Sequence, residues 1–178
     1  MVDVGLLQSV STIAGAIGVC VAAAYYVTNL RHAKKAKEMD LALIFATNMC
    51  SPAGMERFAK VMDMKWENHK DFMEKYGYSN PKMFGNWVSM CLAFEMLGHL
   101  LKSKLTSPET LYSLGAYGCI PMWDKYKEVV QSRRALAFGK KYLVNFEFLA
   151  GELAKIQKRD EPSFEGVWWK RTEQGLKP

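Results

Sequence analysis

The sequence predicts an all-α protein in which one N-terminal transmembrane helix is followed by an irregular multi-helix cytoplasmic bundle. Three observations predict this fold class. Residues 4–30 form a stretch of 27 residues without an acidic or basic side chain. The rest of the chain spaces its apolar residues as helices do and has no run of β-branched residues bounded by turns. Three Ser-Pro or Asn-Pro dipeptides stand where helices would begin.

The uncharged segment is long enough to cross a membrane. A helix rises about 1.5 Å per residue, so about 20 residues cross a hydrocarbon core about 30 Å thick. Polar residues occur at the start of the segment, so we expect its apolar centre over residues 13–27. Tyr25 and Tyr26 stand where an interfacial aromatic belt would lie. We therefore predict a transmembrane anchor over residues 1–30.

Basic residues after the anchor predict its orientation. Asp3 is the only charged residue before position 31. The cations that follow within seven residues are Arg31, Lys34, Lys35 and Lys37. The positive-inside rule places such a cluster in the cytoplasm, where it contacts anionic lipid headgroups. We expect a single-pass protein of the plasma membrane with its N-terminus outside, its C-terminal domain in the cytoplasm and a basic juxtamembrane helix over residues 31–50.

Two alternatives to a membrane span stay open. A cleaved signal peptide would explain the small residues Ala22-Ala23-Ala24, but signal peptides begin with a positive region and Met1-Val2-Asp3 has none. Cleavage would also leave three cysteines, an odd number for a secreted disulfide framework. The other alternative is the buried core helix of a soluble protein, which the length of the segment disfavours.

Small residues recur every four positions within the predicted span, at Ala14, Gly18 and Ala22. They share one helix face, and such a face lets two membrane helices approach closely. Small residues are also common in membrane helices in general. We expect this face as a candidate surface for helix pairing.

The net charge of +6 does not indicate a nucleic-acid partner. Residues 38–178 hold 20 Lys and Arg against 17 Asp and Glu, so the basic excess lies mainly beside the anchor. A nucleic-acid-binding domain would carry a basic face interleaved with aromatic residues. We expect membrane lipid as a partner and no nucleic acid. The cysteines form no C-x-x-C pair, and we expect all four, Cys20, Cys50, Cys91 and Cys119, in packing roles.

The body divides into helices at its cap signals, which are Ser51-Pro52, Asn80-Pro81 and Ser107-Pro108. In each, a side-chain oxygen can accept from first-turn N–H groups, and the proline lacks the N–H that would have no partner. We expect a helical domain over residues 51–158 and a polar tail over 159–178. After the first cap, one apolar stripe is expected from Met55, Phe58, Met62 and Trp66, and the polar residues 67–75 should continue as a more exposed helix.

Residues 83–105 are the most hydrophobic part of the body. Glu95 would sit near the middle of this segment, at a cost of about 2.5–3.5 kcal/mol in a membrane, so we predict a central core helix and no second span. Short helices follow over residues 107–115 and 120–134, the second with an inner face of Trp123, Tyr126 and Val130. The last helix has a heptad-like stripe of Tyr142, Phe146, Leu149, Leu153 and Ile156.

The order of these segments carries a family resemblance. After the anchor and its basic flank come Ser51-Pro52, Asn86 to Leu101 with Phe94-Glu95 and Gly98, Leu105 to Leu114, Trp123-Asp124-Lys125-Tyr126 ahead of Arg133-Arg134, and Phe146-Glu147-Phe148-Leu149-Ala150. The chain resembles, over roughly residues 5–155, a widespread prokaryotic family of unknown function: small proteins with one N-terminal span and an all-helical cytoplasmic domain. The resemblance implies this fold and topology, and it implies no activity.

Two glutamates embedded in apolar sequence are the candidates for buried polar contacts. A buried carboxylate is tolerated when it is paired, so we expect Glu95 or Glu147 to form an interhelical clamp with Arg133 or Arg134. The functional alternative makes Glu95 and His99, one helical turn apart, an acid–base or metal pair. Two ligands alone do not make a zinc site, which usually takes three or four. We therefore predict no catalytic and no metal-binding residue.

Trp168-Trp169-Lys170-Arg171 stands alone in the polar tail. Either one tryptophan folds back onto the body, or the tail is a docking segment in which Trp168, Trp169 and Arg171 bind a partner or the membrane interface.

These observations predict a membrane-anchored accessory or scaffold protein that has no catalytic activity and no cofactor, and that binds another membrane protein or itself. The alternative is a small-molecule or ion-binding sensor with a pocket near Glu95, His99 and Trp123. An uncharacterised membrane-bound hydrolase ranks third, because no phosphate-binding, dinucleotide-binding or G-x-S-x-G motif occurs.

Overall fold

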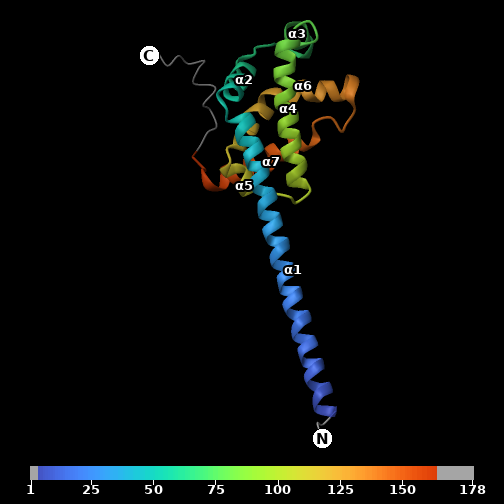
Figure 1. Ribbon diagram of the computed structural model, residues 1–178. Coiled ribbons are helices and arrows are strands. Elements are labelled where there is room, and N and C mark those ends of the chain that lie inside the picture. The colour runs from blue at the N-terminus through green and yellow to red at the C-terminus, as the bar shows by residue number, and fades with distance from the viewer. Residues whose placement is uncertain (1–3, 164–178) are drawn as a thin grey trace. The chain divides into compact units, whose positions relative to one another are not determined.

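The computed structural model describes residues 4–163, and every regular element in this range is a helix (Figure 1). The predicted all-α fold class, with an N-terminal apolar helix ahead of a helical domain, is therefore confirmed. The chain forms two compact units, Met1–Leu41 and Ala42–Pro178. The division falls within the range predicted as the juxtamembrane helix.

The first element, α1 (Val4–Met49), is one unbroken helix of 46 residues. Within the described part of the chain, Ser11–Lys37 is the stretch long and apolar enough to cross a membrane, and none of it is buried. Its threonines do not leave unpaired hydroxyls. Thr12 Oγ1 donates to the Gln8 carbonyl (2.9 Å) and Thr28 Oγ1 to the Ala24 carbonyl (2.8 Å). Such internal pairing is what a helix needs where no water can bind its polar groups.

The second unit holds the remaining elements. They are α2 (Pro52–Asp63), α3 (His69–Tyr76), α4 (Pro81–Lys102), α5 (Pro108–Ser113), the 3-10 turn η1 (Ala116–Gly118), α6 (Cys119–Arg133), the π-helical turn η2 (Arg134–Phe138) and α7 (Val144–Asp160). The three predicted caps are confirmed: the side chains of Ser51, Asn80 and Ser107 accept from the N–H groups three residues on, at 3.0, 3.3 and 3.1 Å.

The expected continuous helix through Trp66 to residue 75 is wrong. α2 ends at Asp63, Met55 is exposed, and Trp66 lies in the connection, where its ring stacks on Tyr126 at 4.8 Å. A new helix starts because Asn68 accepts from the Asp71 N–H at 3.1 Å, a cap that was not predicted from the sequence.

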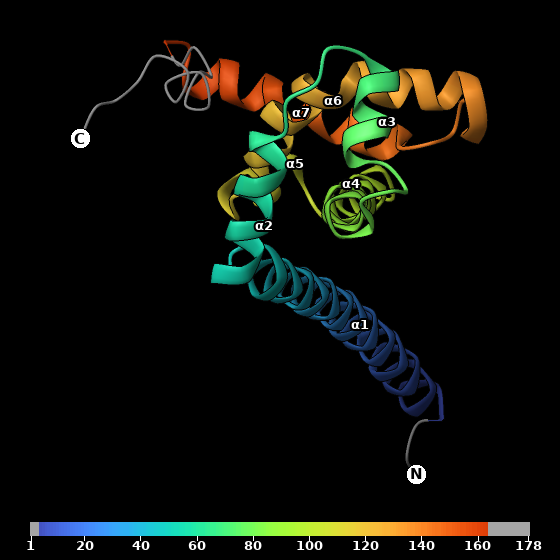
Figure 2. The ribbon, with the colours of Figure 1, turned by 90° about the horizontal axis from the view of Figure 1, so that it is seen from above.

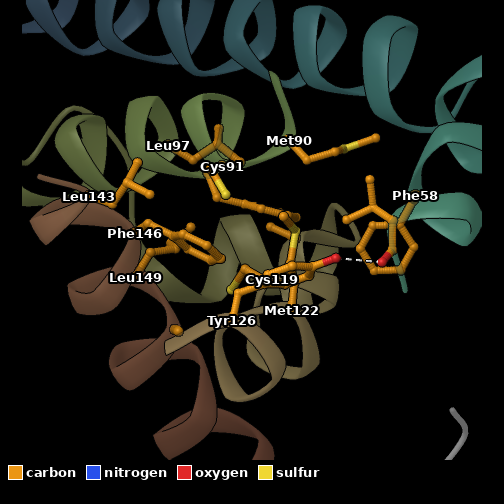
Figure 3. Close-up of a cluster of buried hydrophobic side chains, with 14 of the residues drawn as sticks. Phe58, Met90, Cys91, Leu97, Cys119, Met122, Tyr126, Leu143, Phe146 and Leu149 are labelled. Carbon is orange, nitrogen blue, oxygen red and sulfur yellow. Dashed lines mark hydrogen bonds between the residues drawn. The ribbon is translucent and has the colours of Figure 1, made fainter. Parts of the chain in front are cut away.

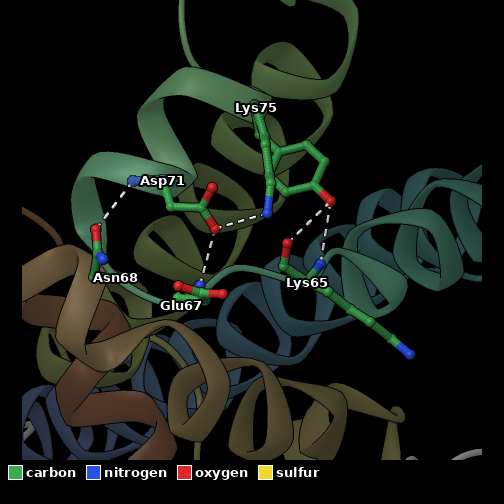
Figure 4. A network of polar contacts seen from close by, with 6 residues as sticks. Lys65, Glu67, Asn68, Asp71 and Lys75 are labelled. Carbon is green, nitrogen blue, oxygen red and sulfur yellow. Dashed lines mark hydrogen bonds and ion pairs between the residues drawn. The ribbon is translucent and has the colours of Figure 1, made fainter.

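Polar contacts hold this break between α2 and α3 (Figure 4). The Asp71 carboxylate accepts from the Glu67 N–H at 3.0 Å and from Lys75 Nζ at 2.8 Å. The Tyr76 hydroxyl lies 3.2 Å from the Lys65 nitrogen and 3.3 Å from its carbonyl oxygen. These bonds replace the helical bonds that the connection gives up.

The core forms around α4, whose predicted role as the central helix is confirmed by the burial of its apolar residues, and Figure 2 looks along its axis. The buried residues of α4 are Trp87, Met90, Cys91, Phe94, Leu97, Gly98 and Leu101. α4 packs mainly against α7, whose buried residues are Phe146, Leu149, Ala150, Leu153 and Ile156. Figure 3 shows Phe146 and Leu149 of α7 in one cluster with Cys91 and Leu97 of α4. The predicted stripe of the last helix is thus buried from Phe146 onward, whereas Tyr142 precedes the helix. In the same core, the Tyr126 hydroxyl donates to the Val61 carbonyl at 2.6 Å.

Gly98 permits the close approach of α4 and α7. A Cβ built at this position would overlap the carbonyl group of Asn145 at the start of α7. A side chain of any size would therefore push the two helices apart.

Candidate functional site

Glu95, the central glutamate of α4, binds the first turn of α7. Its Oε2 accepts from the Phe146 N–H at 2.7 Å, and its Oε1 accepts from Asn145 Nδ2 at 2.9 Å. α7 has no side-chain cap of its own, because its N-cap position is Leu143 in the left-handed conformation (φ 54°). The carboxylate from α4 therefore supplies the acceptor that the first turn needs, and its charge is favourable at a helix N-terminus.

This geometry corrects the arginine clamp expected for Glu95, and it also differs from the alternative pairing with His99. The described residues contain no ion pair of Glu95 with an arginine, because its carboxylate binds α7. His99 is exposed to solvent, and no hydrogen bond or ion pair joins it to Glu95 within residues 4–163. In the same range, no group of three or more His, Cys, Asp or Glu side chains could hold a metal ion. Glu95 is thus a helix-capping residue between α4 and α7.

Arg134 and Glu147 form the one expected glutamate–arginine pair that the described residues contain, with Arg134 Nη1 2.7 Å from Glu147 Oε2. Arg134 also donates from Nε to the Tyr142 carbonyl at 2.7 Å, and its guanidinium lies 5.8 Å from the Trp123 ring centroid. It therefore ties the connection between η2 and α7 to the start of α7. Because Glu147 is half exposed, the ion pair itself is worth only about 0.2–1 kcal/mol.

Arg133 is 4% exposed and is surrounded by aromatic rings instead of a carboxylate. Its Nη1 lies 3.0 Å from Met73 Sδ. The distances from the guanidinium carbon to the ring centroids are 5.3 Å for Phe84, 5.6 Å for Trp87, 4.7 Å for Phe138 and 5.9 Å for Tyr142. We call these four rings the arginine cage. Cation–π attraction to the rings is what compensates the buried charge.

The arginine cage was not predicted from the sequence, although one signal was present. Arg133 follows Val130 by three residues and Tyr126 by seven, so it continues the inner face predicted for this helix. The rings themselves come from α4, η2 and the connection before α7. No local pattern brings them together.

Four buried side-chain nitrogens have no hydrogen-bond partner among the described residues. They are His69 Nε2 on α3, Trp87 Nε1 on α4, Arg133 Nε on α6 and Arg134 Nη2 on η2. Burial of the His69 ring lowers its pKa, and the charge of Arg133 lowers it further. The neighbourhood of Arg133 therefore opposes a second positive charge.

An apolar pocket of about 490 Å³ opens on the second unit. Its lining is Phe45, Met49, Cys50, Met55, Phe58, Phe94, Gly115, Tyr117 and Gly118. We call it the Phe58 pocket. It contains no charged side chain and has the size of pockets that hold small apolar groups. It lies at different residues from the pocket expected near Glu95, His99 and Trp123, and the Trp123 ring packs against Phe146 at 5.3 Å between centroids.

The cysteines divide into two classes. Cys91 and Cys119 are buried, and burial raises the pKa of both thiols, so they are unreactive packing residues. Cys20 and Cys50 are exposed, so the expected packing role is wrong for these two within the chain. Cys50 lies between α1 and α2, at the wall of the Phe58 pocket.

The predicted site residues of α1 are all exposed. The small-residue face and the basic cluster are exposed on α1; they comprise Ala14, Gly18, Ala22, Arg31, Lys34, Lys35 and Lys37. The docking tail with Trp168, Trp169 and Arg171 lies outside the described residues.

No protein-family model, curated protein or solved structure matches the chain. The resemblance to a prokaryotic family of membrane-anchored helical proteins therefore stays a prediction.

Proposed function

We propose that this chain is a membrane-anchored accessory protein that binds another membrane protein or a second copy of itself and catalyses no reaction of its own. One observation carries the proposal. The candidate span Ser11–Lys37 is uncharged as far as Leu30, and all of it is exposed, so nothing in its own unit covers it. An apolar surface of that length is stable only where lipid or protein replaces water.

The roles of the polar residues support a non-enzymatic function. Glu95 is engaged as a cap of α7, and Glu147 is engaged with Arg134. The thiols of Cys91 and Cys119 are buried. These four groups are thus occupied by packing, pairing or capping contacts, and His99, the expected acid–base partner of Glu95, is exposed and does not contact it.

The basic cluster after the span supports the proposed orientation. Arg31, Lys34, Lys35 and Lys37 are all exposed, as a contact with anionic headgroups requires. The N-terminus would lie outside and the helical domain in the cytoplasm.

The Ala14–Gly18–Ala22 face is the proposed surface for a partner helix. A Cβ at Gly18 meets no atom of the chain within 4 Å. Ala16, two positions earlier, is also exposed and lies on the opposite side of a helix with 3.6 residues per turn. Gly18→Leu therefore blocks close helix pairing without disturbing the chain, and Ala16→Leu is its control on the opposite face.

The test is purification of the untagged protein from its own membranes in mild detergent. We expect a partner at a fixed ratio, or a homo-oligomer, with the native protein and with Ala16→Leu, and a loss of this assembly with Gly18→Leu. Elution of the native protein as a single chain without a partner would overturn the proposal. Equal assembly of both variants would show that the interface lies on a surface other than the small-residue face.

A further inference from the structure

We propose that Trp168 and Trp169 of the C-terminal tail bind in the Phe58 pocket of their own chain. The tail would then be an intramolecular ligand that covers the apolar wall of the helical domain.

The pocket offers the chemistry that a tryptophan needs. Phe45, Phe58, Phe94 and Tyr117 supply aromatic walls, and no charged side chain lines the pocket. Met49 and Met55 add flexible side chains that adapt to the shape of a ring. At about 490 Å³ the pocket has room for an indole.

The lining is also incompletely covered by the described residues. Met55 is 56% exposed and Tyr117 is 49% exposed. A tryptophan buries about 150–250 Å² of surface, and apolar burial is worth about 25 cal/mol per Å². Occupation of the pocket by one or both rings of the tail is therefore favourable.

The end of α7 is held close to the pocket. The Tyr112 hydroxyl donates to Glu161 Oε1 at 3.0 Å, and the Tyr112 ring lies 5.7 Å from the ring of Tyr117, which lines the pocket. The ion pair of Arg159 with Glu109 (3.5 Å) also attaches the end of α7 to α5. Glu161 is thus connected to the pocket wall through Tyr112, which contacts the ring of Tyr117.

The chain beyond this point is long enough to reach the pocket. Trp168 follows Glu161 by seven residues, and an extended chain spans up to about 3.3–3.6 Å per residue, or roughly 23 Å in all. A tethered segment of this length has an effective concentration in the millimolar range. The tail therefore has an advantage over a free apolar molecule of modest affinity.

Cys50 provides a reporter for occupation, because its thiol is exposed and lies in the pocket wall. The experiment uses the full chain in detergent with Cys20→Ser, so that Cys50 is the only exposed thiol among the described residues. The rate of Cys50 alkylation by N-ethylmaleimide is compared among this protein, Trp168→Ala/Trp169→Ala and the control Lys170→Ala/Arg171→Ala.

We expect the tryptophan variant to react about tenfold faster, which corresponds to the loss of about 1.4 kcal/mol of tail binding, and the control to react at the parent rate. Equal rates in all three proteins would overturn the proposal. Cys91 and Cys119 report on folding in the same samples, because they react only when the core opens.

Met55→Glu tests the pocket side of the contact. A carboxylate in the mouth of the pocket expels an indole and accelerates Cys50 alkylation in the chain with an intact tail. In Trp168→Ala/Trp169→Ala, Met55→Glu should not accelerate Cys50 alkylation further, because the tail no longer protects the thiol. A carboxylate beside a thiol raises the pKa of the thiol, so its direct effect would be slower alkylation. Additive effects of the two changes would overturn the proposal.

The intramolecular character is tested by dilution. We expect the alkylation rate of the parent protein to be independent of its concentration. Faster alkylation on dilution would show that the tail comes from a second copy and would overturn binding within one chain.

Discussion

The Glu95 carboxylate on α4 accepts a hydrogen bond from the backbone N–H of Phe146 at 2.7 Å and thereby caps α7. The two residues are 51 positions apart in the chain. The cap, the close approach at Gly98 and the buried side chains of both helices all lie at one crossing. The stability of the domain should therefore depend on this crossing more than on its surface ion pairs.

Removing the cap should destabilise the domain. We expect Glu95→Ala to lower the free energy of unfolding by about 1–2 kcal/mol, because a helix N-terminus loses its acceptor. Glu95→Gln should lower it by less, since an amide oxygen still accepts one bond. Urea denaturation followed by circular dichroism measures both. The control is His99→Ala, an exposed change on the same helix. An unfolding curve of Glu95→Ala that matches the parent would refute the cap.

Gly98→Ala should be strongly destabilising because the added methyl group overlaps the Asn145 carbonyl. We expect a loss of about 2 kcal/mol or more, in the range of overpacked cores. Gly151→Ala on α7 is the matched control: its Cβ meets no atom within 4 Å, so better helix propensity should stabilise the domain by about 0.5–1 kcal/mol. Thermal melts of the two variants should move in opposite directions. Equal shifts would contradict the close crossing of α4 and α7.

Two substitutions of Arg133 should distinguish the contribution of the planar guanidinium group to stability from that of its positive charge. Arg133→Lys keeps a charge but places a strongly hydrated ammonium where the planar guanidinium faced the arginine cage. Arg133→Met removes the charge and keeps an apolar side chain, and buried charges are often replaced without loss. We therefore expect Arg133→Lys to be the less stable variant in denaturant titrations. The reverse order would show that the positive charge itself stabilises this site.

Stability should fall on mild acidification because of His69. Its folded-state pKa lies below its ordinary value, since burial and then Arg133 disfavour the charged ring. As the pH falls, the unfolded chain therefore binds this proton before the folded chain does. The stability that the neutral His69 ring contributes is complete above the ordinary histidine pKa of about 6.5 and is lost as the pH falls below it. We expect the melting temperature to drop between pH 7.5 and 5.5 and His69→Gln to reduce that drop. A profile unaffected by His69→Gln would contradict this assignment.

The exposed thiols on either side of the basic cluster test the proposed topology. In native membranes we expect a membrane-impermeant maleimide to leave Cys20 unlabelled from both sides, because the hydrocarbon core surrounds it. Cys50 should react only from the cytoplasmic side. Detergent should make Cys20 reactive, which controls for its intrinsic reactivity. Labelling of Cys20 in intact membranes would argue against the span.

Local chemistry accounts for the features that were predicted correctly. Ser51, Asn80 and Ser107 bond to N–H groups three residues away, so the cap and the start of each helix are determined within one turn. The core character of α4 followed from its apolar residues at helical spacing around Glu95. The break after Asp63 was missed because the polar network that replaces the helix involves Asp71 and Tyr76, 8 and 13 positions further on.

By itself, the sequence determined the helical fold class, the apolar stretch of α1 and the caps, because these depend on hydrophobicity and on bonds between near neighbours. Only the tertiary structure decided that Glu95 caps α7, that Arg133 and not Arg134 lies in the arginine cage, and that the Phe58 pocket forms from four elements. Each of these arises where helices cross. The free energy of burying a charge or an apolar wall depends on which side chains from distant parts of the chain meet it there.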